Sequence, residues 1–547
     1  MTANASSSSL AKAPDDPRVD LAANGLLPPL PAAFITGRDR DLLEPLRFLA
    51  PGEPLPPRPE AGRPLVDRAA VAEALRISNR AFGNPRADLL ADRLADPATR
   101  VVVTGQQPGL FGGPLYTLSK AVAAARWATA LEERGEPAVP VFWVATEDHD
   151  FREVAATTLL GRKETERLDL GDDPLPLTPV GMRTFGSPLA GVLERTAEVL
   201  GGDRWTGWFE EVARWYRPDA RFGEAFCRLM SRLLGDHSPL FLDAMQPELK
   251  RLQQPWLERL VRERQAVGEA IAAAEAAIEE RGYPLQVTPQ KDVSPLFLLH
   301  EGERRRIEWR GDGYRLRGSG DAGGSIDDLL EILADNPTVV SPGVLARPAI
   351  QDVLLGSDLQ LLGPGEMSYM PQAAAVYRAI GVAAPWTTLR PQALVIESHQ
   401  LEHLEGLNVS LAELLGDRSR LDHRLAGGSA ADPTVEPRQR VKEILDDLEG
   451  EALKVDRNLE RPLEKTRQQI LRALDRLSEK TMAAAARSDQ VRLQRVERLR
   501  DTLLPAGALQ ERVVSTAHYP GKYGDRFVES YWRQMTLDGG ILQVITP

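Results

Sequence analysis

The fold of this chain is decided by the segment Arg100-Val-Val-Val-Thr-Gly-Gln-Gln-Pro-Gly-Leu-Phe-Gly-Gly-Pro114. Its β-branched start is typical of a strand that is buried in a parallel sheet. A glycine-rich turn follows, and Pro114 stands where a helix can begin. Residues 115–128 carry apolar side chains at helical spacing, and Ala138-Val-Pro-Val-Phe-Trp-Val-Ala-Thr146 indicates a second buried strand. Strand, turn, helix and strand form a βαβ unit, which predicts an α/β fold around a parallel sheet.

A second unit of the same kind occurs later in the chain. Asp358-Leu-Gln-Leu-Leu362 is the expected strand, Gly363-Pro-Gly365 the turn, and Glu366 to Ile380 the helix. Further strands are expected at 239–242, 382–389 and 393–396. Because ligands of open α/β sheets bind at the carboxyl ends of the strands, both glycine turns are candidate parts of a site.

Size, charge and cysteine content restrict the class of protein. The 547 residues suffice for three or four domains, at roughly 150 residues each. A net charge of -12 argues against nucleic-acid binding, which needs clustered positive charge. Cys227 is the single cysteine, so no internal disulfide and no cysteine-rich zinc site can form. We expect it to be a half-buried structural thiol on a helix over 221–234.

The chain shows no sequence signal for secretion or membrane insertion. Its first residues lack the basic and apolar regions of a signal peptide. No stretch approaches the roughly 18 uninterrupted apolar residues of a membrane helix. These features predict a cytoplasmic protein without a membrane partner.

Changes in composition predict eight regions along the chain. They are a proline-rich N-terminal segment that drapes over a domain (1–60), the first part of the core (61–150), a connecting insertion (151–235), the middle part of the core (236–282), a second insertion (283–335), the last part of the core (336–400), a helical region (401–504) and a C-terminal return segment (505–547). In the second insertion, Gly311-Asp312-Gly313 predicts a hairpin turn.

Apolar residues recur at heptad spacing between Glu436 and Leu504. The regular part of this stripe consists of Val441, Leu445, Leu448, Ala452, Val455 and Leu459, and a weaker part continues to Leu477. Charged residues occupy most other positions, which is typical of a coiled coil. The alternative is a pair of amphipathic helices packed on the core. A bend or hairpin turn is expected at Pro462 or within Ala483 to Asp489.

The turn after Thr104 has the properties of an anion or nucleotide cradle. Its glycines allow close approach of the backbone to a ligand, and it leads into a helix N-terminus, whose free N–H groups attract anions. It is neither a Walker A loop nor a Gly-x-Gly-x-x-Gly turn, and a purely structural tight turn is the alternative. Gln106 and Gln107 need partners for their amides in such a turn.

Glu147-Asp-His-Asp150, at the end of the second strand, places three carboxylates and an imidazole together. Such a cluster can bind a substrate ammonium, hold a divalent metal or position a proton carrier. The alternative is a capping cluster that ends the strand and begins a helix. A zinc site is not expected, because the remaining histidines offer no third ligand.

Several basic residues are candidates for binding a carboxylate or a phosphate. Arg347 and Arg390 can each form a bidentate fork with such a group, and a surface salt bridge is the alternative for both. Lys522 and Tyr523 lie in Pro520-Gly-Lys-Tyr-Gly524, which we expect to be a flexible loop that can close over a ligand. The chain has no Gly-x-Ser-x-Gly elbow, which argues against a serine hydrolase.

Together these motifs resemble the bacillithiol biosynthesis cysteine-adding enzymes, the BshC family of cysteine ligases. The motifs that carry the resemblance are Thr104-Gly-Gln-Gln-Pro-Gly-Leu-Phe-Gly-Gly-Pro-Leu-Tyr-Thr117 with Lys120, Pro140-Val-Phe-Trp-Val-Ala-Thr-Glu-Asp-His-Asp-Phe151, Arg347-Pro348 with Gln351-Asp352, Leu362-Gly-Pro-Gly-Glu366, Leu509-Gln-Glu-Arg512 and Lys522-Tyr523-Gly524. The resemblance implies a Rossmann-like, nucleotidyltransferase-like core with inserted connecting segments. It also implies an α-helical coiled coil that pairs two chains into a homodimer.

The same resemblance implies a ligase that joins the carboxyl group of cysteine to the amine of glucosaminyl-malate. A carboxylate does not condense with an amine in water unless it is activated, so we expect use of ATP, with Mg²⁺ as its partner ion, and an acyl-adenylate intermediate. The expected catalytic residues are His149, Asp148 and Asp150. The positions expected to bind substrate or nucleotide are Thr104, Gly105, Gln106, Gln107, Gly109, Tyr116, Lys120, Glu147, Ser341, Arg347, Gly363, Gly365, Glu366, Arg390, Lys522 and Tyr523.

Two other functions are compatible with these residues. One is a different amino-acid ligase or nucleotidyltransferase on the same core. The other is a nucleotide-binding scaffold protein whose coiled coil holds partners. Formation of the amide product by the purified protein distinguishes the cysteine ligase from both.

Overall fold

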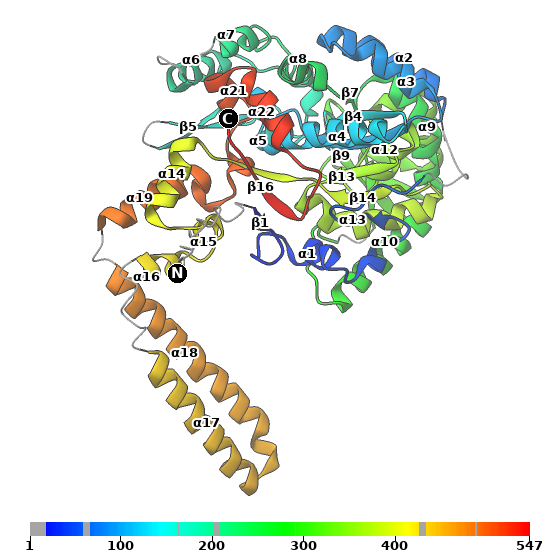
Figure 1. Cartoon of the computed structure of the whole chain (residues 1–547). Helices are drawn as coiled ribbons and strands as arrows, with labels where there is room; N and C mark the ends of the chain where they lie inside the picture. Colours follow the sequence, from blue (N-terminus) through cyan, green and yellow to red (C-terminus); the bar gives the residue numbers. More distant parts are fainter. Residues whose placement is uncertain are drawn as a thin grey trace, which may run out of the picture. The chain divides into compact units, whose positions relative to one another are not determined.

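The computed structural model describes residues 18–57, 66–161, 164–200, 207–289, 292–425, 434–486 and 490–547 (Figure 1). These residues divide into two compact units. The larger unit comprises Arg18–Ile396 together with Ala508–Pro547, and the smaller comprises Glu397–Gly507.

The larger unit is built on a six-stranded sheet in which every neighbouring pair of strands is parallel. Its strands, in spatial order, are β2 (Arg47–Phe48), β14 (Trp386–Leu389), β13 (Leu359–Leu362), β3 (Arg100–Gln106), β4 (Ala138–Val144) and β7 (Leu240–Asp243). The two predicted strand–turn–helix units supply β3 and β13, and helices α4 (Tyr116–Glu133) and α13 (Pro364–Ile380) follow them. The predicted α/β fold with a parallel core is therefore confirmed.

The central strands are apolar on both faces because helices cover both faces. All seven residues of β4 are buried. Val102 and Phe142 pack on one face with residues of α4 and of α8 (Phe222–Leu234). Val103 and Trp143 pack on the other face with α2 (Arg68–Phe82) and α3 (Ala87–Ala95). This two-sided burial explains why these strands are continuous apolar runs rather than alternating patterns.

The N-terminal segment contributes to two sheets instead of only draping over a domain. Its β2 forms the edge of the parallel sheet, where Phe48 is paired with Thr387. Its β1 (Val19–Asp20) pairs with β16 (Ile541–Ile545), which in turn runs parallel to β15 (Gln392–Val395). The remaining parts of the predicted segment, 1–17 and 58–60, lie outside the described residues.

The two predicted insertions form sheets of their own. The first contains the antiparallel pair β5 (Ala156–Leu160) and β6 (Thr165–Asp169). The second supplies most of a five-stranded antiparallel sheet, whose order is β11 (Gly323–Ser325), β10 (Gly313–Leu316), β9 (Glu303–Arg310), β8 (Val293–His300) and β12 (Val340–Pro342). The hairpin turn predicted at Gly311-Asp312-Gly313 joins β9 to β10, as expected.

Cys227 differs from its predicted environment. We expected a half-buried thiol, but the residue is fully buried in α8 among core side chains. Burial raises the pKa of its thiol well above the usual value. The residue is therefore a small core side chain, because a reactive cysteine requires a lowered pKa and solvent access.

The smaller unit is entirely helical in its described part. Short helices α14 (Ser398–Leu407), α15 (Leu411–Leu415) and α16 (Arg418–Leu425) precede two long ones, α17 (Val435–Val455) and α18 (Glu460–Ala486), and α19 (Gln490–Leu503) follows. Figure 1 shows α17 and α18 side by side as a two-helix arm. The two helices are antiparallel. They are joined by an ion pair of 2.6 Å between Arg467 and Glu449 and by another of 2.7 Å between Arg438 and Asp475.

The hairpin turn of this arm lies at 456–459, just before Pro462. There the side chain of Asp456 accepts a hydrogen bond of 2.9 Å from the backbone of Asn458. Helix α18 then continues without a break to Ala486, so the other predicted turn position is wrong for 483–486. The rest of that predicted stretch, 487–489, lies outside the described residues. Among the helices that the structure describes, none is both long and apolar enough to span a bilayer.

Candidate functional site

The two glycine turns lie side by side at the carboxyl ends of β3 and β13. These strands are neighbours, with Val102 paired with Leu359. From β3 the chain adds β4 and β7 on one side, whereas β13 and β14 lie on the other. The boundary between β3 and β13 is thus the point at which the strand order reverses, and this is where open α/β sheets bind ligands.

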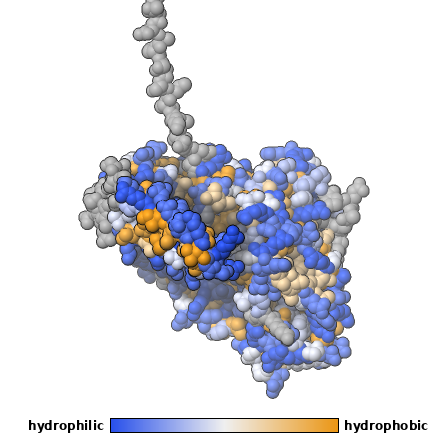
Figure 2. Space-filling model, turned by 90° about the horizontal axis from the view of Figure 1, so that it is seen from below, coloured by the Kyte–Doolittle hydropathy of each residue, from blue (hydrophilic) through white to orange (hydrophobic). Residues whose placement is uncertain are grey.

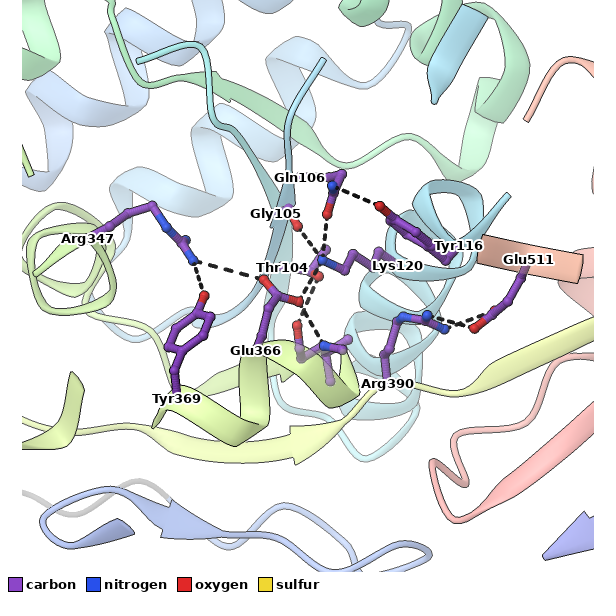
Figure 3. Close-up of polar contacts among 12 residues, drawn as sticks. Thr104, Gly105, Gln106, Tyr116, Lys120, Arg347, Glu366, Tyr369, Arg390 and Glu511 are labelled. Carbon is purple, nitrogen blue, oxygen red and sulfur yellow. Dashed lines mark hydrogen bonds and ion pairs between the residues drawn. The ribbon is translucent and has the colours of Figure 1, made fainter. Parts of the chain in front are cut away.

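Lys120 of α4 is the centre of the contacts between the two turns (Figure 3). Its ammonium donates to the carbonyl oxygen of Gly105 at 2.7 Å and to Oε1 of Gln106 at 2.9 Å. It also forms an ion pair of 2.6 Å with Glu366, the third residue of α13. Glu366 in turn accepts a hydrogen bond of 2.8 Å from the backbone N–H of Gly363. One buried cation therefore connects both turns.

The space between the turns is filled by these side chains. The remaining cavity, lined in part by Gly105, Arg347 and Glu366, has a volume of about 10 Å³, no more than the space that one water molecule needs. Burial lowers the pKa of Lys120. Burial by itself would raise the pKa of Glu366, but the charges of Lys120 and Arg347 lower it. A ligand with phosphates must therefore displace the Lys120–Glu366 contact to enter.

Thr104 and Gly105 have structural partners in this arrangement. The hydroxyl of Thr104 donates to the carbonyl oxygen of Leu361 in the neighbouring strand at 3.0 Å. A Cβ on Gly105 would lie 2.7 Å from the carbonyl oxygen of Trp143 in β4. The glycine at 105 is thus explained by close strand packing.

Gly109 belongs to the same tight turn, and its N–H donates to the carbonyl oxygen of Gln107 at 2.9 Å. Gly365 lies in the first turn of α13.

The two candidate arginines have different surroundings. Arg390 and Glu511 are buried, with side-chain exposures of 2% and 0%, and form a two-pronged ion pair with distances of 2.7 and 3.0 Å. Arg347 donates to the hydroxyl of Tyr369 at 3.0 Å and lies 3.9 Å from Glu366. Arg390 is therefore held by a charge of the protein itself, and Arg347 is the better candidate for meeting an anionic ligand.

Tyr116 and Gln106 border the Lys120 cluster on the side of α4. The Gln106 amide donates to the Tyr116 hydroxyl at 3.1 Å. The guanidinium of Arg390 lies 5.5 Å from the centre of the Tyr116 ring. Burial raises the pKa of Tyr116, so this hydroxyl stays protonated near neutral pH.

Glu147 is separated from the rest of the predicted acidic cluster. Its carboxylate forms a buried ion pair with Lys250 of α9 (Pro247–Arg262). Lys250 also donates to the carbonyl oxygen of Val340 at 2.7 Å. Because both charges are satisfied inside the protein, Glu147 holds α9 against the core and does not face a ligand.

Asp148 and Asp150 shape the turn that follows β4. Asp148 accepts hydrogen bonds from the His149 backbone at 2.7 Å and from the Gln107 amide at 2.6 Å. Asp150 caps helix α5 (Phe151–Val154) by accepting from the Glu153 backbone at 3.3 Å. The capping alternative therefore holds for Asp150. Asp148 keeps a side chain that is 40% exposed and joins this turn to the Gly105 turn through Gln107.

His149 has a partner that the sequence analysis did not identify. The buried Arg304 of β9 lies with a guanidinium nitrogen 3.3 Å from Nδ1 of His149. Arg304 also donates to the Ser341 hydroxyl at 2.8 Å and to the carbonyl oxygen of Pro342 at 2.8 Å. Since arginine only donates, Nδ1 of His149 is the acceptor and the neutral ring carries its proton on Nε2. Burial and the Arg304 charge both lower the pKa of His149.

Glu153 is a second residue that sequence reasoning missed. It accepts a hydrogen bond of 3.3 Å from the amide of Gln106. Burial and the neighbouring charges of Asp148 and Asp150 raise its pKa to about 7. The sequence signal that could have identified Glu153 is its position three residues after Asp150, a candidate catalytic residue. The residue is also exposed to solvent, which screens part of the interaction with the neighbouring charges.

Lys522 and Tyr523 do not lie in a flexible loop. They are the last two residues of helix α21 (His518–Tyr523), and Tyr523 packs against the hydrophobic core. The expectation of a loop that closes over a ligand is therefore wrong. Gly521 forms part of the helix, and Gly524 ends it, because its φ of 64° is readily adopted only by glycine.

The part of the chain that the structure describes contains no group of three or more metal-ligating side chains that could hold an ion. This does not conflict with an ion that arrives on a nucleotide, because Mg²⁺ commonly takes one or two carboxylates and completes its shell with phosphates and water.

Comparison with known proteins gives consistent results. The family model described as "Bacillithiol biosynthesis BshC, N-terminal Rossmann-like domain" matches residues 58–391, and the model described as "Bacillithiol biosynthesis BshC, C-terminal coiled-coil domain" matches residues 393–545. A protein of Salinibacter ruber with the name "Putative cysteine ligase BshC" is 32% identical over 89% of this chain and 90% of its own length. A protein of Symbiobacterium thermophilum with the same name is 31% identical over 87% of this chain and 89% of its own.

Proposed function

The chain belongs to the bacillithiol biosynthesis BshC family, and on that premise we propose that it is an ATP-dependent ligase that joins the carboxyl group of cysteine to the amine of glucosaminyl-malate. The names of its relatives support the ligase class and the use of cysteine. The observation that carries the site assignment is the convergence of both glycine turns and the Asp148–His149 turn at the strand ends, linked by Lys120, Gln106 and Gln107.

The proposed site divides into two parts by charge. Lys120 and Arg347, on the side of the Gly105 and Gly363 turns, form the cationic part. A triphosphate that enters there would exchange the ion pairs that these residues now make with Glu366 for its own. ATP, when bound, supplies the group that activates the cysteine carboxyl.

Asp148 and His149 form the second part. The exposed carboxylate of Asp148 is placed to hold the ammonium group of cysteine. His149, neutral and with its proton on Nε2, can donate a hydrogen bond to an oxygen on which negative charge develops. Arg304 fixes the ring in this form, so it acts through His149. The amide bond would form as the acceptor amine attacks the activated carbonyl carbon, gives up a proton and expels the leaving group that ATP supplied.

The purified protein tests this proposal directly. With cysteine, glucosaminyl-malate, ATP and Mg²⁺ it should form the amide product. The double variant Asp148→Asn with His149→Ala should lose at least about 100-fold in rate, the usual size of such side-chain contributions. His399→Ala, which removes an exposed histidine of α14, is the matched control and should retain full activity.

The outcomes separate the alternatives. An active double variant with native circular dichroism would contradict the site assignment but not the reaction. A protein that forms an amide only with another amino acid would be a different ligase on the same core. A protein that binds ATP and forms no product with any amino acid would support the scaffold function.

The proposal includes a cytoplasmic homodimer formed through the α17–α18 arm. Ile444, Leu448 and Val455 are exposed by 63%, 53% and 84%. They lie four and seven residues apart, so they share one side of α17. Figure 2 shows a stripe of hydrophobic surface bordered by hydrophilic surface on the arm. An exposed apolar stripe at heptad spacing is the kind of surface that a second copy of the same helix covers.

A further inference from the structure

A large cavity in the second insertion is not used by the site described above. It lies between α10 (Arg264–Glu280) and the sheet of β8 and β9, and its volume is about 1140 Å³. Sites for small molecules usually have volumes of roughly 300–1,000 Å³, so the cavity can take a substrate-sized ligand. The apolar rings of Phe297 and Trp309 form part of its wall.

Arg306 brings an uncompensated positive charge to this wall. Its side chain is half-buried, and its guanidinium lies 4.9 Å from the centre of the Phe297 ring. No carboxylate in the described ranges forms an ion pair with it. By contrast, the nearby Arg310 and Arg315 have an ion-pair partner, because Glu308 lies 2.9 Å from Arg310 and 2.7 Å from Arg315. A half-buried cation without a partner favours an anionic ligand.

The same wall connects the cavity to the candidate active site. The Phe297 ring lies 3.8 Å from the Arg304 guanidinium and 5.9 Å, between ring centres, from His149. Arg306 and Arg304 are two residues apart in β9, so their side chains lie on one face of the strand. Arg306 also contributes to the lowered pKa of His149. A ligand anchored at Arg306 can therefore extend along Phe297 toward His149.

We propose that this cavity binds the amine acceptor, with a carboxylate of the acceptor on Arg306 and its carbon skeleton against Phe297. This inference rests on the proposed function, in which the acceptor carries two malate carboxylates and a hydroxyl-rich ring. The remaining polar lining fits such a ligand. The carboxylates of Glu269, Asp292 and Asp312 also border the cavity, and they can accept hydrogen bonds from hydroxyl groups.

Calorimetric titration of the full-length protein with glucosaminyl-malate tests the assignment, with ATP titrated separately as a second probe. Arg306→Gln should weaken binding of glucosaminyl-malate at least tenfold and leave ATP binding unchanged. Arg315→Gln is the matched control, since it removes an arginine of the same sheet that is paired with Glu308 and does not line the cavity. It should leave both affinities unchanged.

A second variant blocks the cavity without removing any charge. Gly268 lines it from α10, and a Cβ at this position meets nothing within 4 Å. Gly268→Phe replaces a glycine in a helix interior by a residue of higher helix propensity, so we expect the variant to fold. We expect at least a tenfold loss in affinity for glucosaminyl-malate. Gly191→Phe in α6 (Leu189–Leu200), another helical glycine with nothing within 4 Å, is the control.

Equal affinity of the wild type and Arg306→Gln for glucosaminyl-malate would overturn the cavity assignment, and so would a loss of ATP binding alone. If the wild type forms the amide while Arg306→Gln keeps the wild-type KM for the acceptor, the cavity assignment fails and the proposed function stands. If glucosaminyl-malate binds in an Arg306-dependent manner but no amide forms, the proposed function fails and the cavity is still the site of this anion.

Discussion

Lys250 and Glu147 are almost fully buried, with side-chain exposures of 1% and 7%, and each is the other's counter-charge. Two charges far from water are stable only as a pair. We predict that Lys250→Met lowers the free energy of unfolding by about 3–5 kcal/mol, because it leaves Glu147 buried and unpaired. Urea denaturation measures this change. The double variant Lys250→Met with Glu147→Leu should be clearly more stable than Lys250→Met alone, and a double variant that is less stable would contradict the pairing.

Glu153 leads to a prediction on pH. Its pKa in the folded protein is raised above the usual 4.5 toward about 7, so the folded state holds this proton more tightly than the unfolded state does. The contribution of Glu153 to stability therefore falls as the pH rises between about 4.5 and 7. The difference in Tm, Glu153→Gln minus wild type, should be more positive at pH 8 than at pH 5. A difference in Tm that is the same at both pH values would show that the pKa of Glu153 is not raised.

At the scale of elements, the Gly105 turn shows how strand packing and the site constrain the same residue. A Cβ at 105 would meet the Trp143 carbonyl oxygen at 2.7 Å and the Trp143 Cβ at 2.9 Å. We predict that Gly105→Ala pushes β3 and β4 apart and costs about 1–3 kcal/mol of stability, as overpacking usually does. Thermal unfolding measures the loss.

The second glycine turn provides the matched control. At Gly365 an added Cβ meets nothing within 4 Å, and the residue lies in the first turn of α13. Gly365→Ala should therefore be neutral or slightly stabilising, since alanine favours the helix. Equal destabilisation by both substitutions would contradict the packing account of Gly105.

At the scale of the whole molecule, the exposed side of the two-helix arm predicts the oligomeric state. The wild type should be a dimer in size-exclusion chromatography with light scattering. Ile444→Glu with Leu448→Glu should yield a monomer, because four charges would then face one another across the interface of two copies. Leu89→Glu, which changes an exposed leucine (49%) of α3 outside the arm, should remain a dimer. A monomeric wild type would overturn the proposal of a homodimer.

Much of the fold could be predicted because its signals are local. The apolar runs of β3 and β4, the glycine turns and the heptads of α17 are each contained in a short stretch of sequence. The N-terminal segment was harder to predict. Its two-residue strands β1 and β2 carry no pattern of their own, and they exist because β16 and β14 offer free edges. The α21 helix was missed because Pro520 and Gly521, which usually mark turns, lie inside it.

The sequence by itself determined the βαβ units, the parallel core and the coiled coil, since hydrophobic periodicity and turn residues act over a few neighbouring positions. Only the tertiary structure decided which charged residues form ion pairs with one another. Arg390 meets Glu511, 121 residues away, and Lys250 meets Glu147, 103 residues away. Buried charges require partners of opposite sign, and the chain supplies these from distant segments that only folding brings together. Within the described residues, the same pairing leaves Arg306 without an ion-pair partner, and that difference cannot be read from the order of residues.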